Sequence, residues 1–142
     1  MGRECTETVS FARGPTLTSS APEIGVIDDD VSVLRALHLF LEVAGFKVET
    51  FSSAEEFLVS PCLERARCLV LDVQLGGMSG FELSDCLAAT QHQIPLIFIT
   101  AHDDAQTRER ARRAGAVKYL PKPFDEDALI QAIHSALGGP CR

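Results

Sequence analysis

The sequence predicts an α/β fold, a doubly wound sheet of five parallel strands with helices on both faces. Two observations support it: short apolar runs alternate with helical segments from residue 23 to residue 137, and polar residues follow directly after the runs. Short apolar runs between helices are typical of buried parallel strands, and their regular alternation with helices is typical of a doubly wound sheet. The predicted strands cover residues 24–27, 47–51, 68–71, 95–99 and 116–120.

The first predicted helix covers residues 31–44. Its polar residues recur every three or four positions, at Ser32, Arg35, His38 and Glu42. This spacing indicates one solvent-facing stripe on a largely buried helix. Asp30 is expected to cap the start of this helix, and Gly45 to end it, because a left-handed C-terminal position favours glycine.

The remaining helices are predicted from similar start and stop signals. A short helix begins after Ser52 or Ser53, either of which can cap it, and a longer one covers residues 79–89. A polar helix covers residues 103–114 and stops at Gly115, and Asp125 caps the last helix. An apolar face on that last helix is formed by Leu129, Ile130, Ile133 and Leu137.

Composition restricts the class of protein. A chain of 142 residues forms one domain with a substantial core, and no apolar run approaches the ~20 residues that a membrane helix needs. The net charge of −7 argues against a broad nucleic-acid-binding surface. The five cysteines are scattered, and we expect small core residues in a reducing cytoplasm.

Residues 1–22 differ from the remainder of the sequence. Thr, Ser, Gly and Pro dominate this segment, which predicts a disordered N-terminal tail. Residues 138–142 are expected to form a short C-terminal tail. They are too few for a DNA-binding module, and resemble either a natural terminus or a cut linker.

Acidic residues follow two of the predicted strands. Asp28 and Asp29 come directly after the first strand, and Asp72 follows the third. Ligands bind parallel sheets beyond the carboxyl ends of the strands, so these carboxylates are expected to share one site. Carboxylates in a small site repel each other unless a cation compensates, and hard oxygen ligands suit Mg²⁺. Helix capping alone would need one acid, and Asp30 is sufficient for it.

A hydroxyl and an amine are predicted at the same edge. Thr100 follows the fourth strand, and Lys122 lies between two prolines after the fifth. Taken singly, Thr100 could be a helix cap and Lys122 a solvated lysine. Because both follow adjacent parallel strands, we expect them to join the acids in a site for a divalent metal and a phosphoryl group.

Taken together, and in their order along the chain, these motifs resemble the receiver domain of bacterial two-component response regulators over residues 23–137. The signature stretches are residues 26–30, 71–73 with Gly80, 99–101, 115–116 and 122–124. Residues 78–80 and 95–101 are most similar to the receivers of LuxR-type transcriptional regulators. The resemblance implies a flavodoxin-like sheet with the strand order 2-1-3-4-5.

The resemblance also implies roles for individual residues. Asp72 would accept a phosphoryl group from a sensor histidine kinase, with Mg²⁺ held by Asp28, Asp29, Asp72 and the Gln74 backbone carbonyl. The phosphoryl oxygens would be bound by Thr100, the Ala101 amide and Lys122. The switch would consist of Thr100 and Tyr119, and the lifetime of the phosphorylated state would be tuned by Gln74 and His102.

Such a domain is a signalling switch and not an enzyme that turns over an external substrate. The helix over residues 103–114, the fifth strand and the last helix would bind a downstream protein or output domain. A phosphorylation-dependent homodimer is a further option. We expect no direct nucleic-acid binding by this chain, no membrane association, and a cytoplasmic location.

One departure and three alternatives accompany this interpretation. Gly76 stands where the family usually has proline, which would loosen the loop after Asp72. A dehalogenase-type enzyme would need an acid at Gln74, and a flavin binder would need a Ser/Thr/Gly loop in place of the Asp28–Asp30 triplet. A receiver-like interaction module that works without phosphorylation usually lacks an acid or the lysine, and neither is missing here.

Overall fold

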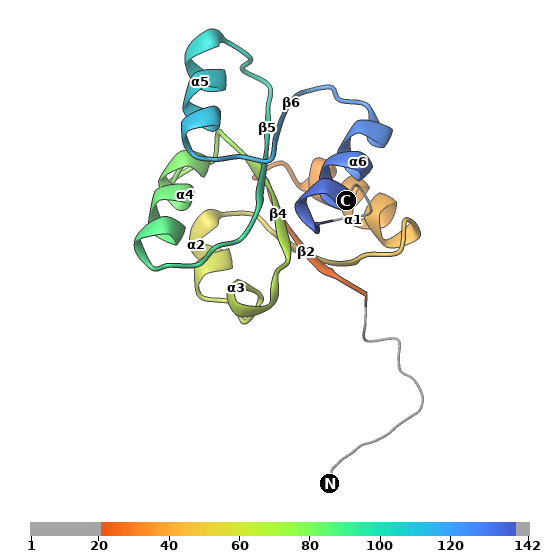
Figure 1. Ribbon diagram of the computed structural model, residues 1–142. Coiled ribbons are helices and arrows are strands. Elements are labelled where there is room, and N and C mark those ends of the chain that lie inside the picture. The colour runs from red at the N-terminus through yellow and green to blue at the C-terminus, as the bar shows by residue number, and fades with distance from the viewer. Residues whose placement is uncertain (1–20, 139–142) are drawn as a thin grey trace, which may run out of the picture.

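The computed structural model describes residues 21–138, which form a parallel five-stranded sheet with helices on both faces (Figure 1). The strands are β2 (Glu23–Ile27), β3 (Lys47–Phe51), β4 (Cys68–Asp72), β5 (Leu96–Thr100) and β6 (Lys118–Pro121). The helices are α1 (Val31–Val43), α2 (Ala54–Leu58), α3 (Cys62–Arg65), α4 (Gly80–Ala89), α5 (Ala105–Arg113) and α6 (Glu126–Ala136). The sheet order β3-β2-β4-β5-β6 confirms the predicted order 2-1-3-4-5. The predicted tails fall almost entirely on residues 1–20 and 139–142, which lie outside the described residues.

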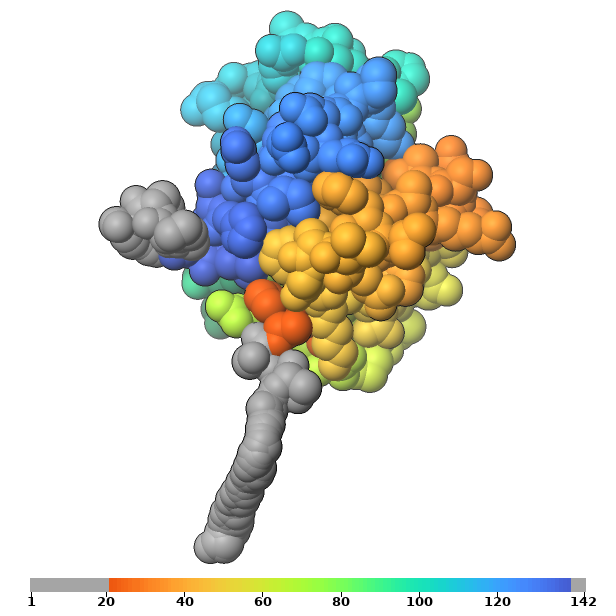
Figure 2. All heavy atoms as spheres, turned by 90° about the vertical axis from the view of Figure 1, so that its right-hand side faces the viewer, coloured from red at the N-terminus to blue at the C-terminus, as the bar shows by residue number. Residues whose placement is uncertain are grey.

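The sheet separates two hydrophobic cores. Successive strand side chains point to opposite faces, so Val26 and Val70 join a core with α1 and α6, whereas Ile27 and Leu71 join a core with α2 to α5. Figure 2 shows α1 and α6 side by side over the first core. Burying each large apolar side chain contributes about 1.5–3 kcal/mol, so the central strands are fixed firmly.

Three helices begin at the predicted capping residues. Asp30 caps α1 by accepting the Ser32 N–H at 2.9 Å, and Ser53 rather than Ser52 caps α2. Asp125 caps α6 as expected. Gly45 and Gly115 follow α1 and α5 with φ of 103° and 78°, and both therefore end their helices in the left-handed conformation that the sequence analysis expected.

Two element boundaries lie two residues away from the prediction, and one element is new. The polar helix α5 begins at Ala105 instead of Asp103, because Asp104 takes the capping position and accepts the Thr107 N–H at 2.8 Å. The last strand begins at Lys118, because the Ala116 N–H still bonds to the carbonyl of Ala111 at 3.2 Å. The short helix α3 was not predicted at all.

The expectation that α1 is largely buried is wrong. Only Leu34, Leu37 and Leu41 are buried, whereas Leu39 is 66% and Val43 is 81% exposed. A helix that packs on one face of a sheet buries a single stripe, and the residues beyond that stripe face solvent even when they are apolar. With 13 residues α1 is the longest helix within residues 21–138, and none there is long and apolar enough to cross a membrane.

Two cysteines are packed in the cores as small apolar residues. Cys68 in β4 and Cys62 in α3 are fully buried. Burial raises the pKa of each thiol to about 12, with an added contribution at Cys62 from the neighbouring Glu23 carboxylate. Both thiols are therefore protonated and unreactive at neutral pH. Cys5 and Cys141 lie outside the described residues.

Glu23 is a buried charge at the start of β2, at the edge of the sheet opposite the predicted site. Its carboxylate accepts bonds from Arg65 Nε at 3.0 Å and Nη2 at 3.2 Å, and Lys47 Nζ lies 3.9 Å away. The Arg65 hydrogen bond outweighs the opposing effect of burial and lowers the pKa of Glu23 below its ordinary value of 4.5. The pair therefore joins α3 to the edge of the sheet.

Replacing Arg65 with alanine should leave the Glu23 carboxylate buried without its main partner. We expect the free energy of unfolding to fall by about 1–3 kcal/mol at neutral pH. Because the folded state lowers the pKa of Glu23, the ionised pair contributes stability above about pH 4.5 that is lost as the pH falls. The difference from wild type should therefore shrink near pH 3. Urea unfolding at both pH values measures this.

The matched control is Arg67→Ala, which removes a neighbouring exposed arginine whose side chain makes no ion pair within residues 21–138. An Arg65→Ala variant no less stable than this control at neutral pH would contradict the assignment.

Candidate functional site

The register of the sheet places the predicted acids next to each other. Ile27 of β2 pairs with Leu71 of β4 in parallel, so the chain leaves these neighbouring strands at Asp28 and Asp72. On the other side of β4, Asp72 pairs with Ile99 of β5. The Lys122 N–H then bonds to the carbonyl of Thr100 at 2.7 Å, which brings the residue after β6 to the same edge.

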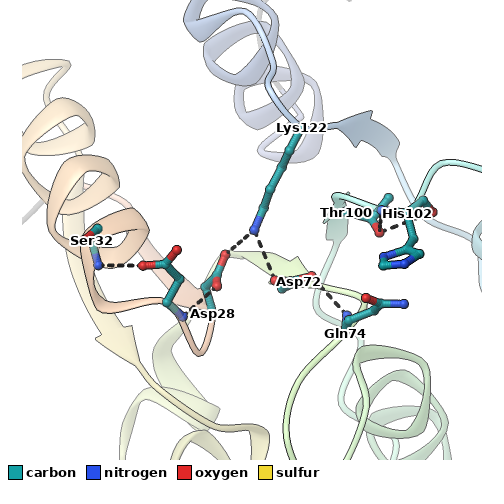
Figure 3. A network of polar contacts seen from close by, with 8 residues as sticks. Asp28, Ser32, Asp72, Gln74, Thr100, His102 and Lys122 are labelled. Carbon is teal, nitrogen blue, oxygen red and sulfur yellow. Dashed lines mark hydrogen bonds and ion pairs between the residues drawn. The ribbon is translucent and has the colours of Figure 1, made fainter.

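Lys122 joins the two acids directly (Figure 3). Its ammonium donates to Asp28 Oδ2 at 2.9 Å and to Asp72 Oδ2 at 3.1 Å. The second oxygen of each carboxylate accepts a backbone N–H two residues further on, that of Asp30 at 2.9 Å and that of Gln74 at 3.0 Å. Asp28 is fully buried and Asp72 nearly so, which makes this a shielded ionic cluster.

The cluster holds more negative than positive charge. Burial and the nearby Asp28 carboxylate raise the pKa of Asp72, and the Gln74 N–H and Lys122 only partly oppose this. Burial acts to lower the pKa of Lys122, but the Asp28 hydrogen bond and the charges of both carboxylates raise it overall. The amine therefore stays charged while it is shared between two acids.

Asp29 supplies a third carboxylate. It is exposed and has no hydrogen-bond or ion-pair partner within residues 21–138. One oxygen each from Asp28, Asp29 and Asp72 lie within 4.8 Å of one another. Three carboxylates facing a single ammonium provide hard oxygen ligands and uncompensated negative charge, so the residues present fit a divalent cation such as Mg²⁺.

A polar cavity of about 460 Å³ opens above this cluster. Its lining consists of Asp28, Asp29, Asp30, Asp72, Gln74, Leu75, Gly76, Ala101 and Lys122. Six of the predicted site residues therefore face one cavity, and three others, Thr100, His102 and Tyr119, are not part of the lining.

Thr100 precedes Ala101 of the cavity lining, but its hydroxyl bonds to the His102 backbone. The side chain is fully buried, and Oγ1 accepts the His102 N–H at 2.9 Å and lies 3.4 Å from the His102 carbonyl oxygen (Figure 3). Thr100 and the Asp72 carboxylate therefore do not contact each other in this structure, and His102 itself is exposed.

Tyr119 is held at the surface by a contact that the sequence analysis missed. Its hydroxyl donates to Asp103 Oδ1 at 3.2 Å, and the same carboxylate accepts Arg108 Nε at 2.9 Å and Nη2 at 2.6 Å. The Arg108 hydrogen bonds lower the pKa of Asp103, which keeps it ionised. The sequence pattern predicts Asp103 to lie inside a helix, and no local pattern indicates a partner 16 residues away.

Gly80 allows α4 to begin close to the site. A Cβ atom at this position would lie 2.5 Å from the Asp72 carbonyl oxygen and 3.0 Å from Val73 Cα, so only glycine fits there without a backbone shift. The Gly80 N–H donates to the Val73 carbonyl at 3.0 Å. Gly80 belongs to the motif that the sequence analysis identified, but its steric role required the structure.

Residues 24–134 match the sequence model of a protein family, the "Response regulator receiver domain". The chain belongs to this family. Nodulation protein W of Bradyrhizobium diazoefficiens is 40% identical over 123 residues, which cover 87% of this chain and 54% of that protein. The response regulator protein TodT of Pseudomonas putida is 40% identical over 121 residues, which cover 85% of this chain and 53% of TodT.

Solved structures agree with this assignment. The response regulator StyR is similar with a TM-score of 0.77 and 48% identity over 84% of this chain and 60% of the StyR chain. The structure titled FixJ-N has a TM-score of 0.76 and 35% identity over 84% of this chain and 95% of its own. The predicted family and fold are thus confirmed. This chain spans about half the length of Nodulation protein W and TodT.

Proposed function

We propose that this receiver domain is a phosphorylation-activated switch that accepts a phosphoryl group on Asp72 from a sensor histidine kinase. The observation that carries the proposal is the convergence of three carboxylates and the Lys122 ammonium on one open cavity. Every acid of the cluster and the lysine are present, which favours this function over an interaction module that works without phosphorylation. Asp72 is then a phosphoacceptor with slow self-dephosphorylation and not the nucleophile of a turnover enzyme.

The proposed transfer uses an oxygen of Asp72 as the nucleophile. The oxygen–phosphorus bond forms while the nitrogen–phosphorus bond of the phosphohistidine breaks, and the electron pair of that bond stays on the imidazole nitrogen. Lys122 already lies 3.1 Å from Asp72 Oδ2, and from there its ammonium can bind a phosphoryl oxygen as negative charge develops. Mg²⁺ held by Asp28, Asp29, Asp72 and the Gln74 carbonyl would neutralise further charge on the phosphoryl oxygens.

Transmission of the signal would require new partners for two side chains. Thr100 would exchange its bond to the His102 backbone for one to the phosphoryl group, beside the Ala101 amide. Tyr119 would leave Asp103 and turn inward, which changes the surface formed by α5, β6 and α6. Gln74 lines the cavity, and the His102 N–H donates to Thr100 Oγ1. Both residues remain our predicted determinants of phosphoryl lifetime.

The surface of α5, β6 and α6 is the proposed site for a downstream protein, an output domain or a second copy of the receiver. FixJ of Bradyrhizobium diazoefficiens and TdiR of Thauera aromatica, two relatives, are named transcriptional regulatory proteins. This supports an output in gene regulation, while the acidic receiver itself would not bind nucleic acid. A cytoplasmic location is part of the same proposal.

Substituting Asp72 with asparagine should abolish phosphorylation, because the amide lacks a nucleophilic carboxylate oxygen. Incubation of the wild type with Mg²⁺ and a small phosphodonor should add one phosphoryl group per chain, measured by intact mass. The control Asp85→Asn alters an exposed acid of α4 and should be modified like the wild type. Phosphorylation that persists in Asp72→Asn would show that another residue is the acceptor.

Phosphorylation should stop when EDTA removes divalent metal. Asp29→Ala should weaken Mg²⁺ binding, measured by titration calorimetry, by about tenfold or more, because it removes the carboxylate without another partner. Asp30→Ala is the matched control, because Asp30 caps α1 through the Ser32 N–H and should affect mainly stability, by about 1 kcal/mol. Equal losses of Mg²⁺ affinity would mean that the roles within the triplet are wrongly assigned.

Thr100→Ala should still accept a phosphoryl group but lose the phosphorylation-dependent change in self-association or partner binding. The reason is that a switch needs contacts that differ between its two states, and this substitution removes the hydroxyl that would change partners. Sedimentation velocity with and without phosphodonor measures self-association. Thr90→Ala, which removes an exposed hydroxyl at the end of α4 and away from the α5–β6–α6 surface, is the control. A wild-type response in Thr100→Ala would rule out this route.

A further inference from the structure

The loop between β4 and α4, residues 73–79, borders the acceptor cavity, and its central residues have few hydrogen-bond partners. Gln74 and Gly76 line the cavity, and Gly76 is followed by a second glycine, Gly77, with φ of 82°. Within residues 21–138 no partner accepts the backbone N–H groups of residues 75–77. Consecutive glycines have a large conformational freedom, so an ordered loop needs a contact from elsewhere.

Glu55 on α2 provides that contact. Its Oε2 accepts the Met78 N–H at 3.1 Å, and this hydrogen bond is the one that connects loop residues 74–78 to a distant element in the described part of the chain. The same carboxylate covers Gly77, since a Cβ atom there would lie 3.0 Å from Oε2 and 3.6 Å from Oε1. The Leu75 and Met78 side chains pack against the core that the sheet forms with α2 to α5.

The neighbouring acid shows that Glu55 is not needed to start its own helix. Glu56 accepts the Ser52 N–H at 2.8 Å and the Ser52 hydroxyl at 3.2 Å, and Ser53 caps α2. The Glu55 side chain makes no hydrogen bond within α2, and its bond to Met78 spans 23 residues. Glu55 therefore contacts the loop, whereas Glu56 stabilises the helix.

We propose that Glu55 is a positioning residue for the acceptor site. It orders the Gly76–Gly77 loop so that Gln74 and Gly76 stay in place at the cavity next to Asp72. The inference rests on the proposed function, because it assigns Glu55 a role in the binding of Mg²⁺ and in the phosphorylation of Asp72. Glu55 touches neither the acceptor nor the lining side chains, and it acts through the backbone of the loop.

The test compares Glu55→Ala with Glu55→Gln, which keeps an acceptor oxygen, and with the control Glu56→Ala. Amide hydrogen exchange of Met78, measured by NMR without phosphodonor, should accelerate about tenfold in Glu55→Ala, because its hydrogen bond is lost. Mg²⁺ affinity and the initial phosphorylation rate should fall by about two- to tenfold in the same variant. Glu55→Gln should stay close to wild type. Glu56→Ala should lower the melting temperature but leave the three measurements unchanged.

A second substitution restores order to the loop by another route. Gly76→Pro removes no hydrogen bond, and a Cβ atom at Gly76 meets nothing within 4 Å. Proline reduces the freedom of the chain, so Gly76→Pro added to Glu55→Ala should recover Mg²⁺ affinity and phosphorylation rate. If the double variant recovers neither Mg²⁺ affinity nor phosphorylation rate, loop order does not control the site and the inference is wrong.

Failure of this inference differs from failure of the proposed function. If the wild type and Glu56→Ala take up no phosphoryl group, the proposed function fails, and Met78 exchange and Mg²⁺ titration still decide the role of Glu55. If the wild type is phosphorylated but Glu55→Ala matches it in exchange, affinity and rate, Glu55 has no positioning role. Equal changes in Glu55→Ala and Glu56→Ala would likewise overturn it, since they would indicate a general effect on α2.

Discussion

The bridge from Lys122 to Asp28 and Asp72 is the interaction on which the site depends. Two carboxylates removed from water repel each other, and each would be strongly destabilised without a cation. Lys122 reaches both at 2.9 and 3.1 Å, and thereby links the segment after β6 to the ends of β2 and β4. One ammonium cannot neutralise these two acids and Asp29 together, so the cluster is held in place yet still attracts a cation.

The two hydrophobic cores make this arrangement possible. Side chains such as Val70 and Leu71 fix β4 from both faces, so the Asp72 backbone cannot move to relieve repulsion. The chemistry itself lies in the segments that follow the strands, where polar backbone groups remain free to bond side chains. Asp28 Oδ1 and Asp72 Oδ1 each accept an N–H from two residues further on, which orients the Oδ2 atoms toward Lys122.

Local signals predicted much of the fold and the composition of the site. Asp28, Asp72 and Lys122 could be found because each directly follows an apolar run, and parallel strands bring such positions together. The strand order came from the family resemblance, since parallel strands in a continuous apolar pattern do not reveal their neighbours. The bonds Tyr119–Asp103 and Glu55–Met78 were missed because they join residues far apart in sequence through side-chain rotamers. The exposure of Leu39 was missed because hydropathy alone does not show which stripe of a helix meets the sheet.

The resting contacts of Thr100 and Tyr119 bear on the energetics of the proposed switch. Thr100 bonds to the His102 N–H and Tyr119 to Asp103, so on activation Thr100 would exchange one hydrogen bond for another and Tyr119 would give up its bond. A typical hydrogen bond contributes only about 0.5–1.5 kcal/mol net, whereas inverting a 1:99 population needs about 5.5 kcal/mol of differential binding. Hydrogen bonds to charged groups contribute about 1.5–3 kcal/mol each, so the proposed phosphoryl contacts of Lys122, Thr100 and the Ala101 amide would together supply free energy of this order. In the proposed switch, the movement of Tyr119 away from Asp103 would transmit the change without supplying its driving force.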